Sequence, residues 1–544
     1  MTALKSLTLH SLLLRSEQMF ADYPAVGFVD GECLSYRQLA EAVRSTSAAL
    51  RSLGVAPGDR VAILSENMPN WAVAYLAVTT MGAVVVPILP DFSESEVANI
   101  LQHAGASIVF GSSRLQPKLA DSAGLTIITL DDFSGLPEQT AAAPPPAEPE
   151  EDDLAAIIYT SGTTGNSKGV MLTHKNIVSN VEASRPLAEM SPAESLVSLL
   201  PLSHTYEGTI GLLVPLSGGA CVYYLDKPPS PSILMPALAK VRPHMMLSVP
   251  LFIEKIYRNR VLTQLQSKAV LRAAMRVAPL RVLLHRAAGR KVKRMFGGRL
   301  HFFGIGGAAV APDVEQFMRE ARFPYAVGYG LTETAPLLAG CGPGTTVFRS
   351  TGPAVDGVEL RVADPDPSTG EGEIQARGPN VMRGYYRDPE RTAESFTADG
   401  WFKTGDLGTI DADGNVFIKG RLKNMILGPS GENIYPEELE AVISAEPLVQ
   451  DCLVLQKSGQ LVALVNLNLD AFKEYLAEMR GGVSDEFDRL RGEAERYLQQ
   501  LQQRVNAQLS SFARISRFIP QMEPFEKTPT MKIKRYLYEA RLSQ

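Results

Sequence analysis

A segment rich in glycine and hydroxyl side chains, YTSGTTGNSKG at residues 159–169, is the part of the sequence best suited to binding phosphate. It follows an apolar run of strand length at residues 154–158. Glycines let the backbone approach an anion, hydroxyl groups donate hydrogen bonds, and Lys168 adds a positive charge. The segment is no Walker A loop, because two residues separate Gly165 from Lys168. Its composition alone also fits a flexible linker, but the order of its residues indicates a nucleoside triphosphate site.

Five later motifs place polar residues at intervals along the chain: PLSH at 201–204, GYGLTE at 328–333, KTGD at 403–406, GRLK at 420–423 and TPTMK at 528–532. The residues in them that could take part in chemistry are His204, Glu333, Asp406 and Lys532. Considered singly, each also fits a plainer interpretation: a structural histidine, a solvated or helix-capping glutamate, a turn aspartate and a solvated cluster of lysines.

Taken in order, these motifs resemble those of the adenylate-forming superfamily, which includes acyl-CoA synthetases, beetle luciferases and the adenylation domains of peptide synthetases. LSY at 34–36 and GDRV at 58–61 resemble the N-terminal pattern of that superfamily, so the resemblance spans nearly the whole chain. It implies a two-step ligation. A carboxylate attacks the α-phosphate of ATP and releases pyrophosphate, and a thiol then displaces AMP from the acyl-adenylate.

The resemblance also implies a role for individual residues. Thr163 and Glu333 would hold Mg²⁺, a hard ion that prefers oxygen ligands. Tyr329 would stack on adenine, and Asp406 would accept hydrogen bonds from the ribose hydroxyls. The residues expected to contact ATP or coenzyme A are Thr160, Ser161, Gly162, Thr163, Thr164, Gly165, Lys168, Gly307, Ala308, Tyr329, Gly330, Thr332, Asp406, Arg421, Lys423 and Gly431.

The catalytic residues implied are Lys532, Lys168, Glu333 and His204. Lys532 would reach the carboxylate and the α-phosphate, and His204 would position the substrate without acting as a base. A fatty carboxylate has a pKa of about 4.3, so it arrives ionised and needs no base; the enzyme must neutralise phosphate charge instead. Met531 stands where the superfamily usually has glycine before this lysine.

The apolar pattern of residues 35–110 predicts the elements that must position these motifs. Strands are expected at residues 60–64, 84–86 and 108–110, with helices between them, which indicates a parallel sheet flanked by helices. The uncharged stretch at 71–90 is expected to be a buried helix and strand rather than a membrane span, because Gly82 and Pro87 divide it. A helical apolar stripe after Ser484 is expected to be core packing.

The fold class expected is therefore α/β. A large domain at residues 1–422 would hold the parallel sheets and a small β-rich subdomain at about 350–420. The resemblance implies a smaller, mobile α+β domain at 423–544, which would rotate about a hinge at Lys423. The Pro- and acid-rich stretch at 138–153 is expected to be a solvated connector.

Composition excludes several classes of protein. Of the 544 residues, 45% are apolar and 21% charged, as in folded proteins rather than disordered or fibrous ones. A net charge of −6 argues against a dedicated nucleic-acid binder. The four cysteines lie far apart, which supports neither a zinc site nor a disulfide framework and fits a reducing cytosol.

Residues 268–299 contain ten Lys or Arg and no Asp or Glu. Leu271, Ala274, Met275 and Ala278 would share one helical face there. Such a basic amphipathic segment fits either a solvated insertion or peripheral contact with the inner face of a membrane, and long-chain acyl-CoA synthetases are similar in having one. The sequence therefore predicts a cytoplasmic enzyme that joins a medium- to long-chain fatty acid to coenzyme A. The alternatives are ligation to an acyl carrier protein and a non-catalytic lipid-binding homologue.

Overall fold

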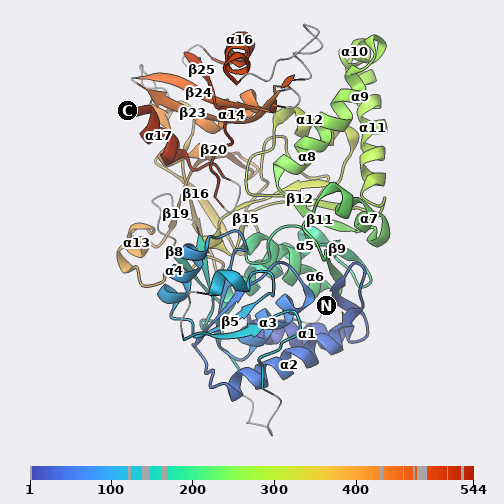
Figure 1. Cartoon of the computed structure of the whole chain (residues 1–544), viewed down its shortest axis with the longest axis vertical. Coiled ribbons are helices and arrows are strands. Elements are labelled where there is room, and N and C mark those ends of the chain that lie inside the picture. Colours follow the sequence, from blue (N-terminus) through green and yellow to red (C-terminus); the bar gives the residue numbers. More distant parts are fainter. Residues whose placement is uncertain are drawn as a thin grey trace.

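Two seven-stranded sheets form most of the molecule (Figure 1). The computed structural model describes residues 3–120, 124–137, 148–160, 168–427, 433–446, 448–457, 459–469, 472–473, 487–510, 513–528 and 532–543. The first sheet has the order β18 (Gly384–Tyr385), β8 (Lys168–Thr173), β7 (Leu154–Thr160), β4 (Val84–Ile88), β3 (Arg60–Leu64), β5 (Ile108–Gly111) and β6 (Thr126–Thr129). The second has the order β13 (Tyr325–Val327), β12 (Phe302–Ile305), β11 (Met245–Ser248), β9 (Ser195–Val197), β10 (Cys221–Tyr224), β1 (Pro24–Phe28) and β2 (Cys33–Ser35).

Parallel pairing dominates both sheets, as the alternation of helix and strand predicted. In the first sheet, β4, β3, β5 and β6 run parallel, whereas β8 and β18 add antiparallel strands at one edge. In the second, every strand from β13 to β1 pairs in parallel and β2 is antiparallel. The helices that cover these sheets are α1 (Leu9–Phe20), α2 (Tyr36–Ser52), α3 (Pro69–Thr80), α4 (Glu94–Ala104), η1 (Gln116–Leu119), α5 (His174–Ala188), η2 (Tyr206–Leu213), α6 (Val214–Gly218), α7 (Pro231–Val241), α8 (Pro250–Ile256), η3 (Tyr257–Leu262), α9 (Thr263–Gln266) and α12 (Pro312–Ala321).

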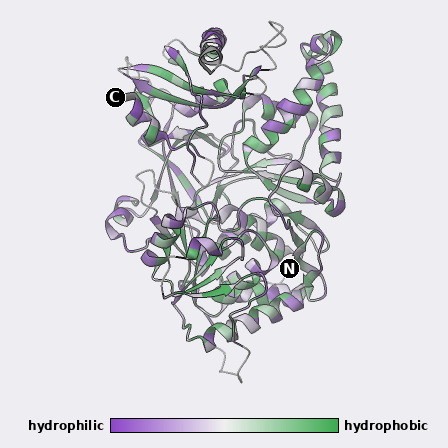
Figure 2. Ribbon diagram, viewed as in Figure 1, coloured by the Kyte–Doolittle hydropathy of each residue, from purple (hydrophilic) through white to green (hydrophobic). Residues whose placement is uncertain are grey.

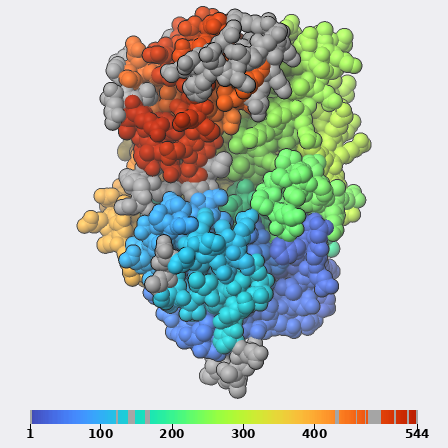
Figure 3. Space-filling view, in the orientation of Figure 1, coloured from blue at the N-terminus to red at the C-terminus, as the bar shows by residue number. Residues whose placement is uncertain are grey.

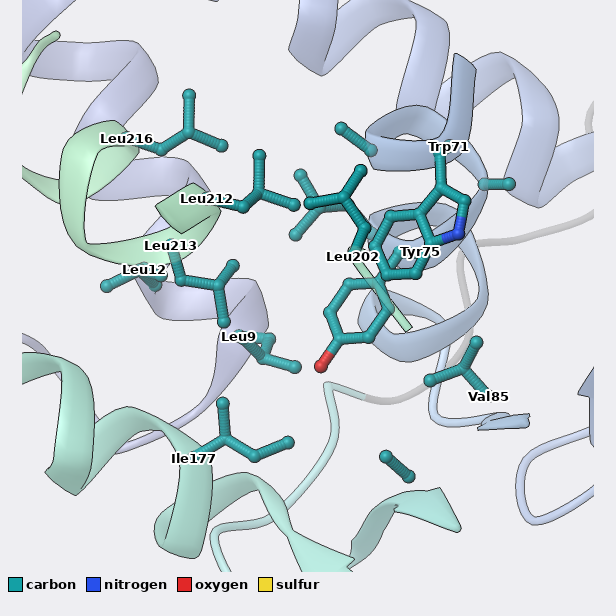
Figure 4. Close-up of a cluster of buried hydrophobic side chains, with 14 of the residues drawn as sticks. Leu9, Leu12, Trp71, Tyr75, Val85, Ile177, Leu202, Leu212, Leu213 and Leu216 are labelled. Carbon is teal, nitrogen blue, oxygen red and sulfur yellow. The ribbon is translucent and has the colours of Figure 1, made fainter. Parts of the chain in front are cut away.

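One apolar core joins helices and strands from distant parts of the sequence. Figure 4 shows side chains of α1, α3, β4, α5, η2 and α6 meeting there, around the stacked rings of Trp71 and Tyr75. All residues of α3 from Trp71 to Thr79 are buried, and β4 is buried along its whole length. The predicted buried helix and strand at 71–90 are thus confirmed. Among the described helices, none has the length and apolar content to cross a bilayer.

Side-chain caps fix where several helices begin. Ser35, Ser93 and Thr173 each accept a hydrogen bond from the backbone of the third helical residue, whose own side chain bonds back to the cap. Such reciprocal bonds satisfy amide groups that the first turn leaves unpaired.

A four-stranded antiparallel sheet lies later in the sequence, with β18 of the first large sheet between its second and third strands. Its order is β16 (Glu359–Ala363), β17 (Gly372–Arg377), β19 (Phe402–Ile410) and β20 (Val416–Arg421). The neighbouring short elements are β14 (Tyr329–Gly330), η4 (Thr332–Thr334), β15 (Leu337–Ala339), α13 (Pro389–Glu394) and η5 (Leu422–Asn424).

The C-terminal segment, at the top of Figure 1, has its own core. Its elements are β21 (Ile426–Leu427), β22 (Asn433–Ile434), α14 (Pro436–Ser444), β23 (Val449–Lys457), β24 (Gln460–Leu467), α16 (Phe487–Asn506), β25 (Arg517–Pro520) and α17 (Arg535–Ser543). The stripe predicted after Ser484 lies on α16, where Ala494, Leu498, Leu501 and Val505 are buried in that core. Its interpretation as core packing is confirmed for these residues.

The basic segment differs from the single helical face that the sequence suggested. It forms two helices, α10 (Ala269–Met275) and α11 (Ala278–Met295), separated at Arg276 and Val277. Pro279 lies in the first turn of α11, where proline is tolerated, but it cannot continue a helix from α10. Leu271, Ala274 and Met275 are half-buried, whereas Ala278 is exposed, so these residues do not form one outward apolar face.

The core in Figure 4 predicts unequal effects for two similar substitutions. Leu12→Ala, at a side chain 2% exposed, should lower the free energy of unfolding by about 2–5 kcal/mol, because it leaves a cavity. Leu53→Ala, at a side chain 37% exposed, should change it far less. Urea denaturation followed by tryptophan fluorescence checks this; equal midpoint shifts would contradict the assignment of the core.

Candidate functional site

The candidate site draws residues from the first large sheet, from the segment after β14 and from the four-stranded sheet. Lys168 is the first residue of β8, Glu333 lies in η4, and Asp406 lies on β19. These residues are far apart in the sequence, yet the structure brings them together with Lys532 of the C-terminal segment.

Lys168, Glu333 and Tyr385 form a compact polar cluster. Lys168 Nζ lies 2.7 Å from Glu333 Oε1 and 2.7 Å from the Tyr385 hydroxyl. The Tyr385 hydroxyl donates to Glu333 Oε1 at 2.8 Å. Burial favours a raised pKa for Glu333, which is 7% exposed, but the Lys168 ammonium and the hydrogen bonds to the carboxylate, that of Tyr385 included, together leave the pKa below its usual range. The carboxylate is therefore ionised at neutral pH.

Tyr329, Asp406 and Arg421 form a second cluster on neighbouring strands. The Tyr329 hydroxyl donates to Asp406 Oδ2 at 2.8 Å, and Arg421 Nε lies 2.8 Å from Asp406 Oδ1. Asp406 and Arg421 are cross-strand partners of β19 and β20. Burial raises the pKa of Asp406, and the guanidinium of Arg421 opposes that shift. Both carboxylate oxygens thus have partners that a ligand hydroxyl could supplement or replace.

Lys532 lies close enough to the two clusters to interact with them electrostatically. Part of Lys532 is exposed to solvent. Its ammonium group nevertheless lies near enough to other protein atoms to lose part of its hydration. Desolvation lowers the pKa of Lys532, Arg421 lowers it further, and the carboxylates of Asp406 and Glu333 oppose the shift. Two hydrogen bonds join Thr528 to Lys532: the Thr528 amide donates to the Lys532 carbonyl at 2.7 Å, and the Lys532 amide donates to the Thr528 hydroxyl at 3.2 Å.

Polar contacts hold the C-terminal segment against the rest of the chain in this arrangement. Arg258 of η3 donates to the carbonyl of Ala445 at 2.8 Å. The Tyr435 hydroxyl donates to Glu371 Oε2 at 2.6 Å. These contacts flank α14 and accompany the approach of Lys532 to Asp406.

His204 lies two residues before the first residue of the π-helix η2, and its Nδ1 accepts a hydrogen bond from the Tyr206 amide at 3.2 Å. Burial lowers the pKa of His204 to about 4, and the nearby positive charge of Lys532 contributes. The imidazole is therefore neutral near pH 7, which suits a positioning role better than that of a proton acceptor at that pH.

Glycines leave room at two predicted contact positions. A Cβ at Gly330 would overlap the carbonyl oxygen of Pro336. Gly307 has a φ of +88°, a conformation that residues with side chains rarely adopt, and it lies exposed beside Ala308, two residues after the end of β12. Thr332 is buried in η4.

The remaining predicted residues divide into those that the structure describes and those that it does not. Thr160 ends β7, and its hydroxyl is buried with no hydrogen-bond partner among the described residues. Lys423 is exposed in η5. The predicted residues outside the described ranges are Ser161, Gly162, Thr163, Thr164, Gly165 and Gly431.

The donor set around Glu333 fits a magnesium ion that phosphates help to hold. Mg²⁺ is commonly bound by one or two carboxylates together with substrate phosphates and water, rather than by a cage of protein ligands. Among the described residues, no group of three or more metal-binding side chains occurs. Glu333, which is ionised and bonded to Lys168, is the carboxylate that could bind such a magnesium ion.

Sequence reasoning missed Tyr385 and Glu207. Tyr385 lies 217 positions from Lys168 and 52 from Glu333, and no spacing rule links such residues. Glu207 is fully buried in η2, where its Oε1 accepts from the Ser198 hydroxyl at 2.6 Å and its Oε2 has no partner among the described residues. A glutamate within an apolar run, YEGTIGLL, was the signal available for it.

Comparisons with known proteins agree with this arrangement. Residues 13–386 match the family described as AMP-binding enzyme. The chain belongs to that family. This AMP-binding enzyme is 28% identical to the peroxisomal long chain acyl-CoA synthetase 7 of Arabidopsis thaliana, over 97% of this chain and 84% of that protein. It is 31% identical to 4-coumarate–CoA ligase 3 of Oryza sativa subsp. japonica, over 80% of this chain and 77% of that protein.

A solved structure shares the fold of this AMP-binding enzyme over nearly its whole length. The ATP-bound MatB of Rhodopseudomonas palustris superposes with a TM-score of 0.76 at 27% identity, covering 98% of this chain and 99% of that one. The predicted α/β fold class and the resemblance to adenylate-forming enzymes are thus confirmed. The roles of the individual site residues stay predictions.

Glu207 generates a prediction about stability and pH. Burial raises its pKa to about 8, from an ordinary value of 4.5 in the unfolded chain. The folded protein therefore holds a proton that the unfolded chain releases, and stability contributed by this group falls as pH rises from about 4.5 to about 8. Glu207→Gln removes that titration, so its Tm relative to wild type should rise across this window.

The measurement is thermal unfolding of both proteins through that pH range. Glu32→Gln, which changes an exposed glutamate, serves as the control and should follow wild type. A constant difference between Glu207→Gln and wild type at all pH values would show that Glu207 is not protonated in the folded protein.

Proposed function

We propose that this AMP-binding enzyme activates a medium- to long-chain fatty acid with ATP and transfers the acyl group to coenzyme A, releasing pyrophosphate and AMP. The observation that carries the proposal is the convergence of Lys168, Glu333, Asp406 and Lys532 from distant parts of the chain. A non-catalytic lipid-binding homologue would have no need to keep these four residues together.

The proposed first step needs positive charge and alignment rather than a base. The fatty carboxylate is the nucleophile and attacks the α-phosphorus of ATP; the bond from that phosphorus to the bridging oxygen breaks, and pyrophosphate leaves. Lys168 and Lys532 supply cationic hydrogen-bond donors for charge that accumulates on the phosphoryl oxygens. Magnesium held at Glu333 would neutralise further phosphate charge when bound.

The clusters around Asp406 support assignments for the nucleoside. Asp406 would accept hydrogen bonds from the ribose hydroxyls, and Tyr329 and Arg421 hold its carboxylate in place for this. The hydroxyl of Thr160, which has no partner among the described residues, would donate to a phosphate. We propose that residues 161–165, Gly307, Ala308, Gly330 and Thr332 also contact ATP.

The proposed second step needs the C-terminal segment to move. We infer a boundary at Lys423, which divides a large domain at 1–422 from a C-terminal domain at 423–544. Rotation about Lys423 would withdraw Lys532 and bring Gly431 toward the path of the thiol. The thiol of coenzyme A then attacks the acyl carbon, and AMP leaves. Polar contacts between the described residues of the two parts, such as Arg258 with Ala445, are of a kind that can break and reform.

The acid is the finer part of the proposal. The similarity to a long chain acyl-CoA synthetase over 97% of this chain favours a fatty acid. The similarity to a 4-coumarate–CoA ligase at 31% identity favours, as a second candidate, an aromatic acid. The acceptor is proposed as coenzyme A, with an acyl carrier protein as the alternative.

Pyrophosphate release tests the substrate. With ATP and Mg²⁺, we expect release with fatty acids of graded length, acceleration by coenzyme A and appearance of acyl-CoA. Pyrophosphate release with fatty acids but without formation of acyl-CoA would indicate that the acceptor is a carrier protein. Release with 4-coumarate and with no fatty acid would overturn the fatty-acid proposal.

Lys532→Ala tests the proposed division of labour between the two steps. The substitution should lower adenylate formation by at least about a hundredfold, because an ammonium aimed at developing charge is lost. Thioester formation from synthetic acyl-AMP should change little, since Lys532 would have left the site by then. Lys534→Ala, two residues along the same segment, is the matched control and should leave both steps near wild type. Equal loss of both half-reactions in Lys532→Ala would contradict the proposed rotation.

A further inference from the structure

The helices α10 and α11 carry large apolar side chains that face solvent. Val270 is 78% exposed, Val277 48%, Leu280 46% and Leu283 63%. Scattered exposed apolar residues are common, but four of them within one short stretch of a helical hairpin mark an interaction surface. We call residues 268–299 the basic hairpin. Figure 1 shows it along one edge of the molecule, with α10 at the outermost corner.

The outward face of α11 changes in character along its length. Leu280, Leu283 and Ala287 are exposed near its beginning, and Arg290, Lys291 and Arg294 are exposed near its end. Their spacing of three and four residues places them on one side of the helix. Figure 2 shows hydrophobic and hydrophilic stretches on α10 and α11. The exposed apolar residues thus lie at the end of the hairpin where α10 meets α11, which we call the apolar tip. The exposed basic residues of α11 lie further along that helix.

Packing against α12 fixes which side of α11 faces outward. Arg281 Nη2 lies 2.8 Å from Glu320 Oε1, and His285 Nδ1 lies 2.7 Å from Glu320 Oε2. A Cβ at Gly289 would come within 2.6 Å of Ala321 Cβ, so the two helices approach closely there. The opposite face, with its leucines and basic residues, is consequently held toward solvent.

The charge of the hairpin specifies an anionic partner. Residues 268–299 hold ten Lys or Arg and no Asp or Glu. Of these ten, Arg281 alone forms an ion pair with a carboxylate in the part of the chain that the structure describes. Arg272 and Arg276, beside the apolar tip, are also exposed. In Figure 3 this part of the chain forms one edge of the visible face, beside the C-terminal segment.

We propose that the basic hairpin docks on an anionic lipid bilayer, with Val270, Val277, Leu280 and Leu283 entering the interface and the basic residues contacting lipid phosphates. A cationic segment with exposed apolar residues at one end has the composition of an interfacial membrane-binding element. A second copy of the chain fits less well, because a two-fold contact would set one set of ten basic residues against another. The inference rests on this surface and does not depend on which acid the enzyme activates.

Co-sedimentation with lipid vesicles tests the proposal on the full-length protein without substrates. We expect binding to vesicles of phosphatidylcholine with phosphatidylglycerol, weak binding to phosphatidylcholine alone, and release as salt is raised. Leu280→Asp combined with Leu283→Asp should weaken binding about tenfold or more, as should Arg290→Gln with Lys291→Gln and Arg294→Gln. Leu53→Asp, at an exposed leucine after α2, is the matched control and should bind like wild type.

Each variant is first compared with wild type by thermal unfolding, and the two sets of substitutions act on separate parts of α11, so a folding defect in one leaves the other informative. Equal binding to both kinds of vesicle, or no binding, would overturn the proposal. So would a dimer in solution that the Leu280→Asp and Leu283→Asp substitutions dissociate, because the face would then be an interface between copies. Retention of wild type by an acidic carrier protein but not by vesicles would equally overturn it.

Discussion

The ion pair between Lys168 and Glu333 is the interaction on which the site depends. Glu333 is almost fully buried, and an isolated carboxylate in such a place would take up a proton or destabilise the fold. Lys168 and the Tyr385 hydroxyl, each within 2.8 Å of one carboxylate oxygen, keep it ionised. The strand β8, the turn η4 and the strand β18 must therefore be held in register for the site to exist. This requirement ties the chemistry to the architecture of the first large sheet.

The same electrostatic constraint governs the approach of the C-terminal segment. Lys532 loses hydration where it lies, and the carboxylates of Asp406 and Glu333 offset that loss. Arg421 works against that offset, and the pKa of Lys532 stays below its usual range. Among the described residues, polar contacts such as that of Tyr435 with Glu371 join this segment to the rest of the chain.

The apolar core gives the site its rigidity. Helices α1, α3 and α5 meet strands and helices of both large sheets around Trp71 and Tyr75. The π-helix η2 packs into this core and carries Glu207, while His204 lies two residues before its first residue. The buried carboxyl of Glu207 thus connects η2 with Ser198, the residue that follows β9. At the far edge, α11 is fixed by Glu320 and leaves its outer face free for contact.

The sequence by itself determined the α/β class, the positions of the early strands and the membership of the adenylate-forming enzymes. Strands such as β3 and β5 were predictable because local apolar periodicity and turn residues define them, and the motifs carry their own order. Only the tertiary structure decided that Lys168 meets Glu333 and Tyr385, because these partners lie 165 and 217 positions away and no local pattern encodes such contacts. It also decided which leucines of the basic hairpin face solvent. A new helix begins there, with Pro279 in its first turn. The face of this helix that packs on α12 is determined by contacts with Glu320 and Ala321, which lie outside the hairpin.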